Sequence, residues 1–399
     1  MKRSKKVLLI VLASGLLLAA GVGVFVHFST RQTLLRAEAF LFRRLQVARV
    51  DNDAFRFFYA TNRGAGSLDG GLEDRFNREH EAGLRFGSFD ARIQPTLALS
   101  AVFDPQKWSR NEEVAITSQR SLAREELVRQ VRDMVEQSPH RSLLLIVHGY
   151  RERFVSALRK TAFVSHVLDI NTPVMVFDWP GDQPGLPLVS YRRAAEIAEA
   201  SAPDLADLLR LVLTEVQPGQ VWLVANSMGG QVVAEAFGLL YEFPEFADLE
   251  PEIEEVVLTA PDIDMDEFDD RFEDEIRALT KNLTVYVSSN DRALIASRLA
   301  NRGRRRGEST LNSRDVRQDQ IEEAIRLAEM IDPDSDRVTL VDVTPVNRTV
   351  NFHNFYLESP EVYNDIFRRL ANERAPRSRE LYPVRTQAGA VYWVLTRGR

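Results

Sequence analysis

The sequence predicts an α/β fold in which a mostly parallel β-sheet carries helices on both faces. Short apolar runs at residues 143–147 and 221–225 contain no alternating polar residues, which is typical of strands buried on both sides. Segments with helical spacing separate these runs, and strands that alternate with helices favour a parallel sheet. With 399 residues, 44% of them hydrophobic, the chain is long enough to bury a full core.

The first 50 residues predict a membrane anchor and a stalk. Residues 1–6 form a basic tail, and the apolar residues 7–28 would make a helix about 33 Å long, enough to cross a bilayer. A cleaved signal peptide is the alternative, but its apolar part is shorter than this one. The basic tail predicts a cytoplasmic amino terminus and a periplasmic or otherwise extracytoplasmic domain, a bias that the arginines after the span dilute. Residues 29–50 are expected to form a juxtamembrane stalk.

The remaining chain predicts one α/β domain over residues 51–376 and a C-terminal extension with a hairpin over 377–399. Glycine and proline place loops at 64–71 and 180–187. A last helix is expected to begin with Ser359 at the N-cap and Pro360 in the first turn. Strands are expected at 55–60, 95–103, 143–147, 174–177, 221–225, 256–259, 283–287 and 338–343, and helices at 122–137, 154–168, 194–216, 228–240, 318–330 and 360–370.

Residues 220–230 place Ser227 at a sharp turn between a buried strand and a helix. Strand, serine-bearing turn and helix together are the context of a nucleophile elbow. The crowded turn needs small residues two positions before and after the serine. Gly229 meets this need, and Ala225 stands where glycine is usual. An ordinary helix-capping serine is the alternative interpretation.

The histidines and aspartates after Ser227 predict a catalytic triad. In α/β-hydrolases the chain order is serine, acid, histidine, and His353 is the only one of six histidines that follows Ser227. It is therefore the candidate base. Asp291 follows the second strand after the elbow and is the candidate acid. Asp262, which lies among other carboxylates after the preceding strand, is the alternative acid.

An oxyanion hole needs two backbone N–H groups that point to where negative charge develops. The first is expected from Met228, the residue after the nucleophile. The second is expected from Tyr150, in the loop after residues 143–147, where His148 and Gly149 allow close backbone approach. We expect His148 to order this loop rather than to transfer protons.

Composition narrows the possible partners and cofactors. The net charge of −7 argues against a nucleic-acid partner. Because there is no cysteine, thiol nucleophiles, thiolate metal sites and disulfides are excluded. An acidic loop that begins at Asp262 has some calcium-ligand spacing, but Glu267 stands where the turn needs glycine. No metal and no cofactor are predicted.

Six motifs are spread over residues 55–360 of the chain. They are Phe58-Tyr59-Ala60-Thr61-Asn62-Arg63, Val147-His148-Gly149-Tyr150, Phe177-Asp178-Trp179-Pro180-Gly181, Ser227-Met228-Gly229, Ala260-Pro261-Asp262-Ile263-Asp264 and Ser289-Asn290-Asp291-Arg292-Ala293-Leu294. With these motifs the chain resembles a bacterial family of α/β-hydrolase proteins of unknown function that are esterase/lipase-like and often membrane-anchored. Asn226 stands where that family often has histidine. The resemblance implies an esterase-like activity and leaves the substrate open.

Together these observations predict a membrane-anchored serine hydrolase that cleaves carboxylic ester-like bonds through Ser227, His353 and Asp291. The expected substrate is a small-molecule or lipid ester, with the acyl chain length and a closing lid left open. The alternative is an inactive α/β-hydrolase-fold protein that acts as a binding or scaffold protein at the membrane. The oligomeric state stays open.

Overall fold

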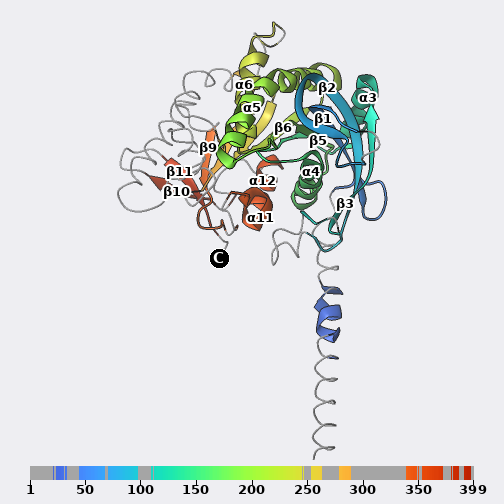
Figure 1. Cartoon of the computed structure of the whole chain (residues 1–399). Coiled ribbons are helices and arrows are strands. Elements are labelled where there is room, and N and C mark those ends of the chain that lie inside the picture. The colour runs from blue at the N-terminus through green and yellow to red at the C-terminus, as the bar shows by residue number, and fades with distance from the viewer. Residues whose placement is uncertain are drawn as a thin grey trace, which may run out of the picture.

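A computed structural model of the chain shows a large twisted sheet with helices packed on it (Figure 1). Near the amino terminus it describes residues 21, 24–30 and 32–33. In the remainder it describes residues 45–67, 71–97, 109–110, 112–244, 246, 253–262, 278–288, 338–347, 349, 353–371, 379, 381–385 and 391–396.

Within the described residues, eleven strands form one sheet in the order β10-β11-β9-β8-β7-β6-β4-β5-β1-β2-β3. The pairs from β9 through β1 are all parallel, whereas β2, β3 and β10 add antiparallel pairs at the two ends. In Figure 1 the β1–β3 group lies at one end of the sheet and β9–β11 at the other. The strands are β1 Ala54–Ala65, β2 Phe76–Ile93, β3 Val114–Leu122, β4 Ser142–Val147, β5 Val174–Asp178, β6 Gln220–Asn226, β7 Ile253–Thr259, β8 Leu283–Val287, β9 Val338–Asp342, β10 Leu381–Arg385 and β11 Val391–Leu395.

Two hydrophobic clusters cover the two faces of the sheet. Alternate residues of β4 divide between them: Leu143 and Leu145 pack with one cluster, Leu144 and Ile146 with the other. The first cluster contains residues of α3, α5 and α6, and the second contains residues of α4, α11 and α12. The predicted α/β fold with helices on both faces is therefore confirmed. The helices are α3 Arg124–Gln137, α4 Phe154–Leu168, α5 Pro187–Leu211, α6 Gly229–Tyr241, α11 Phe355–Glu358 and α12 Pro360–Leu370, and α5 continues as the π-helical turn η2 Val212–Val216.

Several predicted elements agree closely with the structure. The helix at 154–168, the strand at 283–287, the helix at 360–370 and the C-terminal hairpin are all present. Ser359 does occupy the N-cap of α12, but its side chain makes no capping hydrogen bond. β11 of the hairpin pairs in parallel with β9 and so extends the main sheet.

Other predicted elements are wrong. β1 continues to Ala65, so the expected loop at 64–71 begins later, and residues 95–97 form a turn and a helical residue rather than a strand. α5 begins at Pro187, whereas the sequence predicts a loop at 180–187 and a helix only from residue 194. Residues 45–50 form a turn and an isolated bridge, and Leu45 N donates a hydrogen bond to Asp169 Oδ1 at 2.8 Å; a stalk over residues 29–50 stays a prediction. β2 and β3 have no counterpart among the predicted strands.

Some predictions lie outside the described residues. The proposed anchor at 7–28 is described only at residues 21 and 24–28, and the helix at 318–330 and Asp291 are not described. Within the described part of the chain, no helix combines the length and the apolar character that a membrane span requires.

Candidate active site

The predicted triad residues follow neighbouring parallel strands. Ser227 comes directly after β6, Asp262 shortly after β7, and His353 in the loop between β9 and α11. Because β6 to β9 run parallel, their carboxyl ends meet at one edge of the sheet, the usual position of sites in such folds. Asp291 lies outside the described residues, but it follows β8, which is the second strand after the elbow strand, as expected.

Ser227 has the strained backbone of a nucleophile elbow. Its φ of +54° falls in the left-handed region, which a residue with a side chain adopts only when its surroundings enforce it. Two hydrogen bonds do so: Ser227 N donates to Thr259 O at 2.9 Å, and Gly230 N donates to Ser227 O at 2.8 Å. The turn between β6 and α6 is thereby fixed to the end of β7, and the serine lies at its tip.

Two glycines allow the chain to pack tightly around the elbow. A Cβ on Gly229 would lie 2.6 Å from His148 O and 2.8 Å from Val147 O, both backbone atoms. A Cβ on Gly149 would lie 2.9 Å from Ser227 Cβ. The methyl group of Ala225, by contrast, is accommodated at a position only 1% exposed. The loop after β4 and the elbow therefore contact each other through backbone atoms at Gly149 and Gly229.

The structure brings Ser227 and His353 to the same sheet edge but does not join them. Ser227 Oγ forms no hydrogen bond with any residue that the structure describes. His353 is half-buried at a bend before α11. Catalytic hydrogen bonds are often long or poorly aligned in the absence of substrate, so His353 stays the candidate base although Ser227 Oγ forms no hydrogen bond within the described residues.

The two expected oxyanion donors have free backbone N–H groups. Neither Met228 N nor Tyr150 N donates a hydrogen bond to an acceptor in the described part of the chain. Each lies next to the contact between the elbow and Gly149. The Tyr150 side chain points elsewhere, since its hydroxyl pairs with Ser190 Oγ at 2.5 Å. This arrangement leaves two backbone donors available near the candidate nucleophile.

Asp262, the alternative acid, is buried and already bound. Only 3% of it is exposed, and the Tyr191 hydroxyl donates a hydrogen bond to its Oδ2 at 2.6 Å. Its backbone N also donates to Ser227 O at 3.2 Å. Asp262 therefore connects the elbow with the first turns of α5, a structural role that the sequence did not reveal.

Asn226 stands where the similar family often has histidine, and its side chain bonds β6, the strand before the elbow, to β7. Its Nδ2 lies 3.2 Å from Thr259 O and 3.1 Å from Thr259 Oγ1. The side chain is buried at 3% exposure. An amide at this position thus connects β6 with β7 one residue before Ser227.

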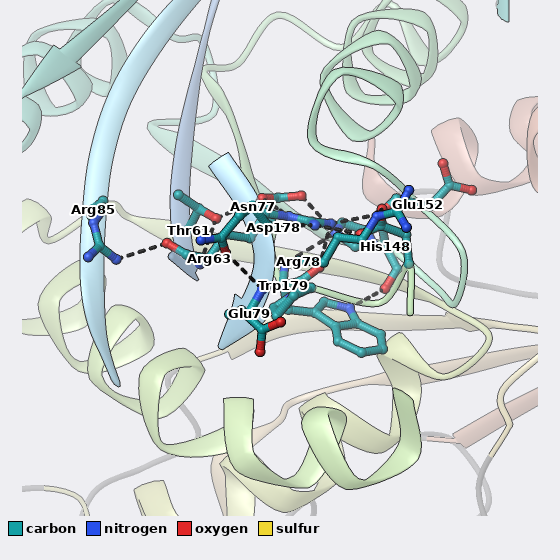
Figure 2. Close-up of polar contacts among 12 residues, drawn as sticks. Thr61, Arg63, Asn77, Arg78, Glu79, Arg85, His148, Glu152, Asp178 and Trp179 are labelled. Atoms are coloured by element: carbon teal, nitrogen blue, oxygen red, sulfur yellow. Dashed lines mark hydrogen bonds and ion pairs between the residues drawn. The ribbon is translucent and has the colours of Figure 1, made fainter. Parts of the chain in front are cut away.

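Figure 2 shows a buried charged network that includes His148, the residue before Gly149 at the contact with the elbow. Arg63, near the end of β1, donates a hydrogen bond from Nε to Oδ2 of Asp178, the last residue of β5, at 2.8 Å. Asp178 also accepts a hydrogen bond from the Thr61 hydroxyl at 2.7 Å, and its Oδ1 lies 3.1 Å from His148 Nε2. All four side chains are at most 2% exposed. The network joins the ends of β1, β4 and β5.

His148 belongs to this network and orders the loop, as expected. Its Nδ1 lies 2.9 Å from Gly149 O, and its Nε2 lies 3.1 Å from Asp178 Oδ1 and 3.2 Å from Trp179 N. Its ring stacks on Trp179 at 5.7 Å, and Trp179 Nε1 donates to His148 O at 2.8 Å. With both ring nitrogens engaged, His148 is not placed to act as a base for Ser227.

Neighbouring positive charges lower the pKa values of two buried carboxylates, Asp178 and Glu152. Burial alone would raise the pKa of Asp178, but the Arg63 guanidinium and the His148 hydrogen bond outweigh it and hold this pKa below its usual value. Burial likewise opposes ionisation of Glu152, and the Lys160 ammonium lowers the pKa of that carboxyl overall. Both side chains are therefore stable anions near the candidate site.

Arg63 and Asp178 belong to motifs in the sequence, but the sequence alone predicts no role for either residue. They are 115 positions apart, so no local pattern connects them. One signal was present: Asp178 directly follows an apolar strand, and Arg63 follows another. Opposite charges at the carboxyl ends of two parallel strands could have predicted this pair.

Comparison with known proteins bears on the fold and the family. A family model described as "Alpha/beta hydrolase of unknown function (DUF900)" matches residues 123–374, more than half of the chain. No match to a curated protein was found.

Similar solved structures include three esterases. Pf2001 from Pyrococcus furiosus aligns with a TM-score of 0.35 and 12% identity, over 59% of this chain and 84% of that one. Est1E from Butyrivibrio proteoclasticus gives 0.35 and 12%, over 60% and 93%. Brefeldin A esterase, described as a bacterial homologue of human hormone sensitive lipase, gives 0.37 and 12%, over 88% and 86%.

Proposed function

The chain belongs to this family of α/β-hydrolases, and from that premise we propose that it is a serine hydrolase acting on carboxylic ester-like bonds. The observation that carries the proposal is the elbow: Ser227 stands at φ +54° between β6 and α6, with the backbone of Gly149 against its Cβ. A serine that only caps a helix does not require this backbone conformation or such close packing.

In the proposed reaction Ser227 Oγ attacks the ester carbonyl carbon while His353 accepts the hydroxyl proton. The backbone N–H groups of Met228 and Tyr150 stabilise the negative charge that develops on the carbonyl oxygen. His353 then donates its proton to the leaving alcohol, and the acyl group remains on Ser227. Water, activated by the same histidine, releases the acid and restores the serine. Asp291 orients His353 throughout.

The sharpest test is labelling with a fluorophosphonate, which reacts with activated serines. The full-length protein in detergent should be labelled at Ser227, and Ser227→Ala should abolish the labelling. Ser201→Ala is the matched control, because Ser201 is also buried and its hydroxyl has no partner within the described structure. Labelling that persists in Ser227→Ala, or a folded native protein that the probe does not label, would refute the proposal. A panel of esters with increasing acyl length then defines the substrate.

The proposal includes anchoring of the enzyme at a membrane through residues 7–28. Support comes from the length and apolarity of this segment. Its described residues Phe25 and Phe28 are also 73% and 58% exposed. With the amino end in the cytoplasm, protease added to intact spheroplasts should digest the domain. Full protection would place the domain in the cytoplasm instead.

A further inference from the structure

All three nitrogen atoms of the Arg63 guanidinium have hydrogen-bond partners near the candidate site. Arg63 is 1% exposed, so its charge needs close partners. Besides Asp178, it contacts Asp182, with Nη1 2.6 Å from Oδ1. Its Nη2 donates to two backbone oxygens, Glu152 O at 2.7 Å and Trp179 O at 2.9 Å. One planar fork thus binds the loop after β4 and the loop after β5 at the same time.

Hydrogen bonds to other parts of the chain hold several residues of the loop after β4, residues 148–153, which we call the oxyanion loop. Trp179 Nε1 binds His148 O, and Arg151 N donates to Gly181 O at 3.0 Å. Arg63 binds Glu152 O. The Glu152 carboxylate is bound in turn by Lys160, and by Ser156 Oγ at 2.5 Å, both on α4. These contacts leave little freedom to the loop.

Between these fixed points the backbone N–H groups of Gly149 and Tyr150 donate no hydrogen bond within the described residues, and that of Tyr150 is the expected oxyanion donor. Arg151, the next residue, has a φ of +66°, a conformation that is unfavourable for arginine and persists only when neighbours enforce it. The bond from Arg151 N to Gly181 O and the clamp on Glu152 O supply this constraint. The direction of the Tyr150 N–H therefore depends on contacts made one and two residues later in the chain.

We infer that Arg63 is a positioning residue for the reaction: by tying Glu152 O to Trp179 O, it holds the oxyanion loop so that the Tyr150 N–H points toward the carbonyl oxygen of the substrate. The inference rests on the proposed function, because it assigns Arg63 a task within that reaction. Arg63 itself touches neither Ser227 nor a reacting atom. It acts through backbone geometry, at a site where donors must lie within about 2.7–3.1 Å of the oxyanion.

The test compares Arg63→Lys and Arg63→Met with the native full-length protein in detergent. Lysine keeps the charge but cannot bind two carbonyls and two carboxylates in one plane. The matched control is Arg56→Met, because Arg56 is also on β1 and also forms a two-point pair with a carboxylate, Asp90 at 2.8 and 3.1 Å, away from the loop. Active enzyme is counted by fluorophosphonate titration, and kcat and KM are measured separately.

We expect Arg63→Lys to lower kcat by roughly 10- to 100-fold per titrated site, with little change in KM, since losing one oxyanion donor costs about 10²- to 10³-fold and a misdirected donor costs less. Arg56→Met should leave kcat at the native value. A folded Arg63→Lys with native kcat overturns the inference, as does a change confined to KM or to the unfolding temperature.

Limited proteolysis tests the clamp without any need for turnover. Trypsin cleaves after arginine, and Arg151 and Arg153 both lie in the oxyanion loop. Cleavage there should be slow in the native protein and in Arg56→Met, and faster in both Arg63 variants. Equal rates in all four proteins overturn the inference even if the esterase function stands. A native protein that resists fluorophosphonate refutes the proposed function and the inference together.

Discussion

Replacing Gly149 with alanine would place a methyl group directly against the nucleophile elbow. Its Cβ would lie 2.9 Å from Ser227 Cβ and 3.0 Å from Asn226 O. Carbon atoms prefer a separation of about 3.5–4.0 Å, so the oxyanion loop or the elbow must move by roughly 0.5 Å or more. The loop is fixed through Arg151 and Glu152, and the elbow through Thr259, so neither can move freely.

The magnitude follows from this displacement. Overpacking of this kind costs about 1–3 kcal/mol of stability. A displacement approaching 1 Å between catalytic groups costs on the order of 10²-fold in rate. We therefore expect Gly149→Ala to lower kcat by about 10- to 100-fold, because Tyr150 N–H moves with the loop away from the oxyanion position.

The assay is ester hydrolysis at saturating substrate, together with the rate of fluorophosphonate labelling and the unfolding temperature. Gly219→Ala is the matched control, since a Cβ there would meet Arg141 Cβ and O at an ordinary 3.4 Å. Native kcat and native unfolding temperature in Gly149→Ala would show that the loop and the elbow are not packed as described.

Two further predictions concern the acid and the pH dependence. Asp291→Asn should lower kcat on the order of 10⁴-fold with the fold retained, whereas Asp262→Asn should cost far less and act through the lost Tyr191 contact; the opposite ranking in folded variants would move the acid to Asp262. Because the folded-state pKa values of Asp178 and Glu152 lie below their unfolded values, their contribution to stability is complete above about pH 4–5 and is lost as pH falls through the folded values. Urea unfolding between about pH 3 and 6 should show this loss, and Asp178→Asn should flatten it; equal slopes for the two proteins would contradict the assignment.

The central strands were predictable because their apolar runs are continuous. Every residue of β4 and β8 is buried, which gives a signal that no exposed position interrupts. β2 lacks this signal: no residue in its first half is buried, and Gly83 with φ +97° breaks its alternation. The sequence predicts too late a start for α5 because the prolines and glycines before residue 190 are loop signals, although Pro187 occupies the first turn of the helix.

Site residues that are contiguous in sequence could be predicted, whereas pairs formed between distant parts of the chain could not. Ser227 and Gly229 could be recognised because strand, turn and helix are contiguous in sequence. The partners of Asp178 come from β1 and from the loop after β4, so only the sheet order brings them together. The same holds for Tyr191 and Asp262, whose contact depends on where α5 packs.

The position of β1 within the sheet has a consequence for how the chain can be assembled. β1 is the first strand in sequence, yet it lies between β2 and β5, with its parallel edge against Phe177 and Asp178. During synthesis this apolar strand can pair early with β2, but its second edge stays uncovered until β5 has emerged. An uncovered apolar edge is a template for aggregation. A shorter chain that starts at residue 123 has the converse defect, because β5 then becomes an open edge and Arg63 is missing from the oxyanion loop.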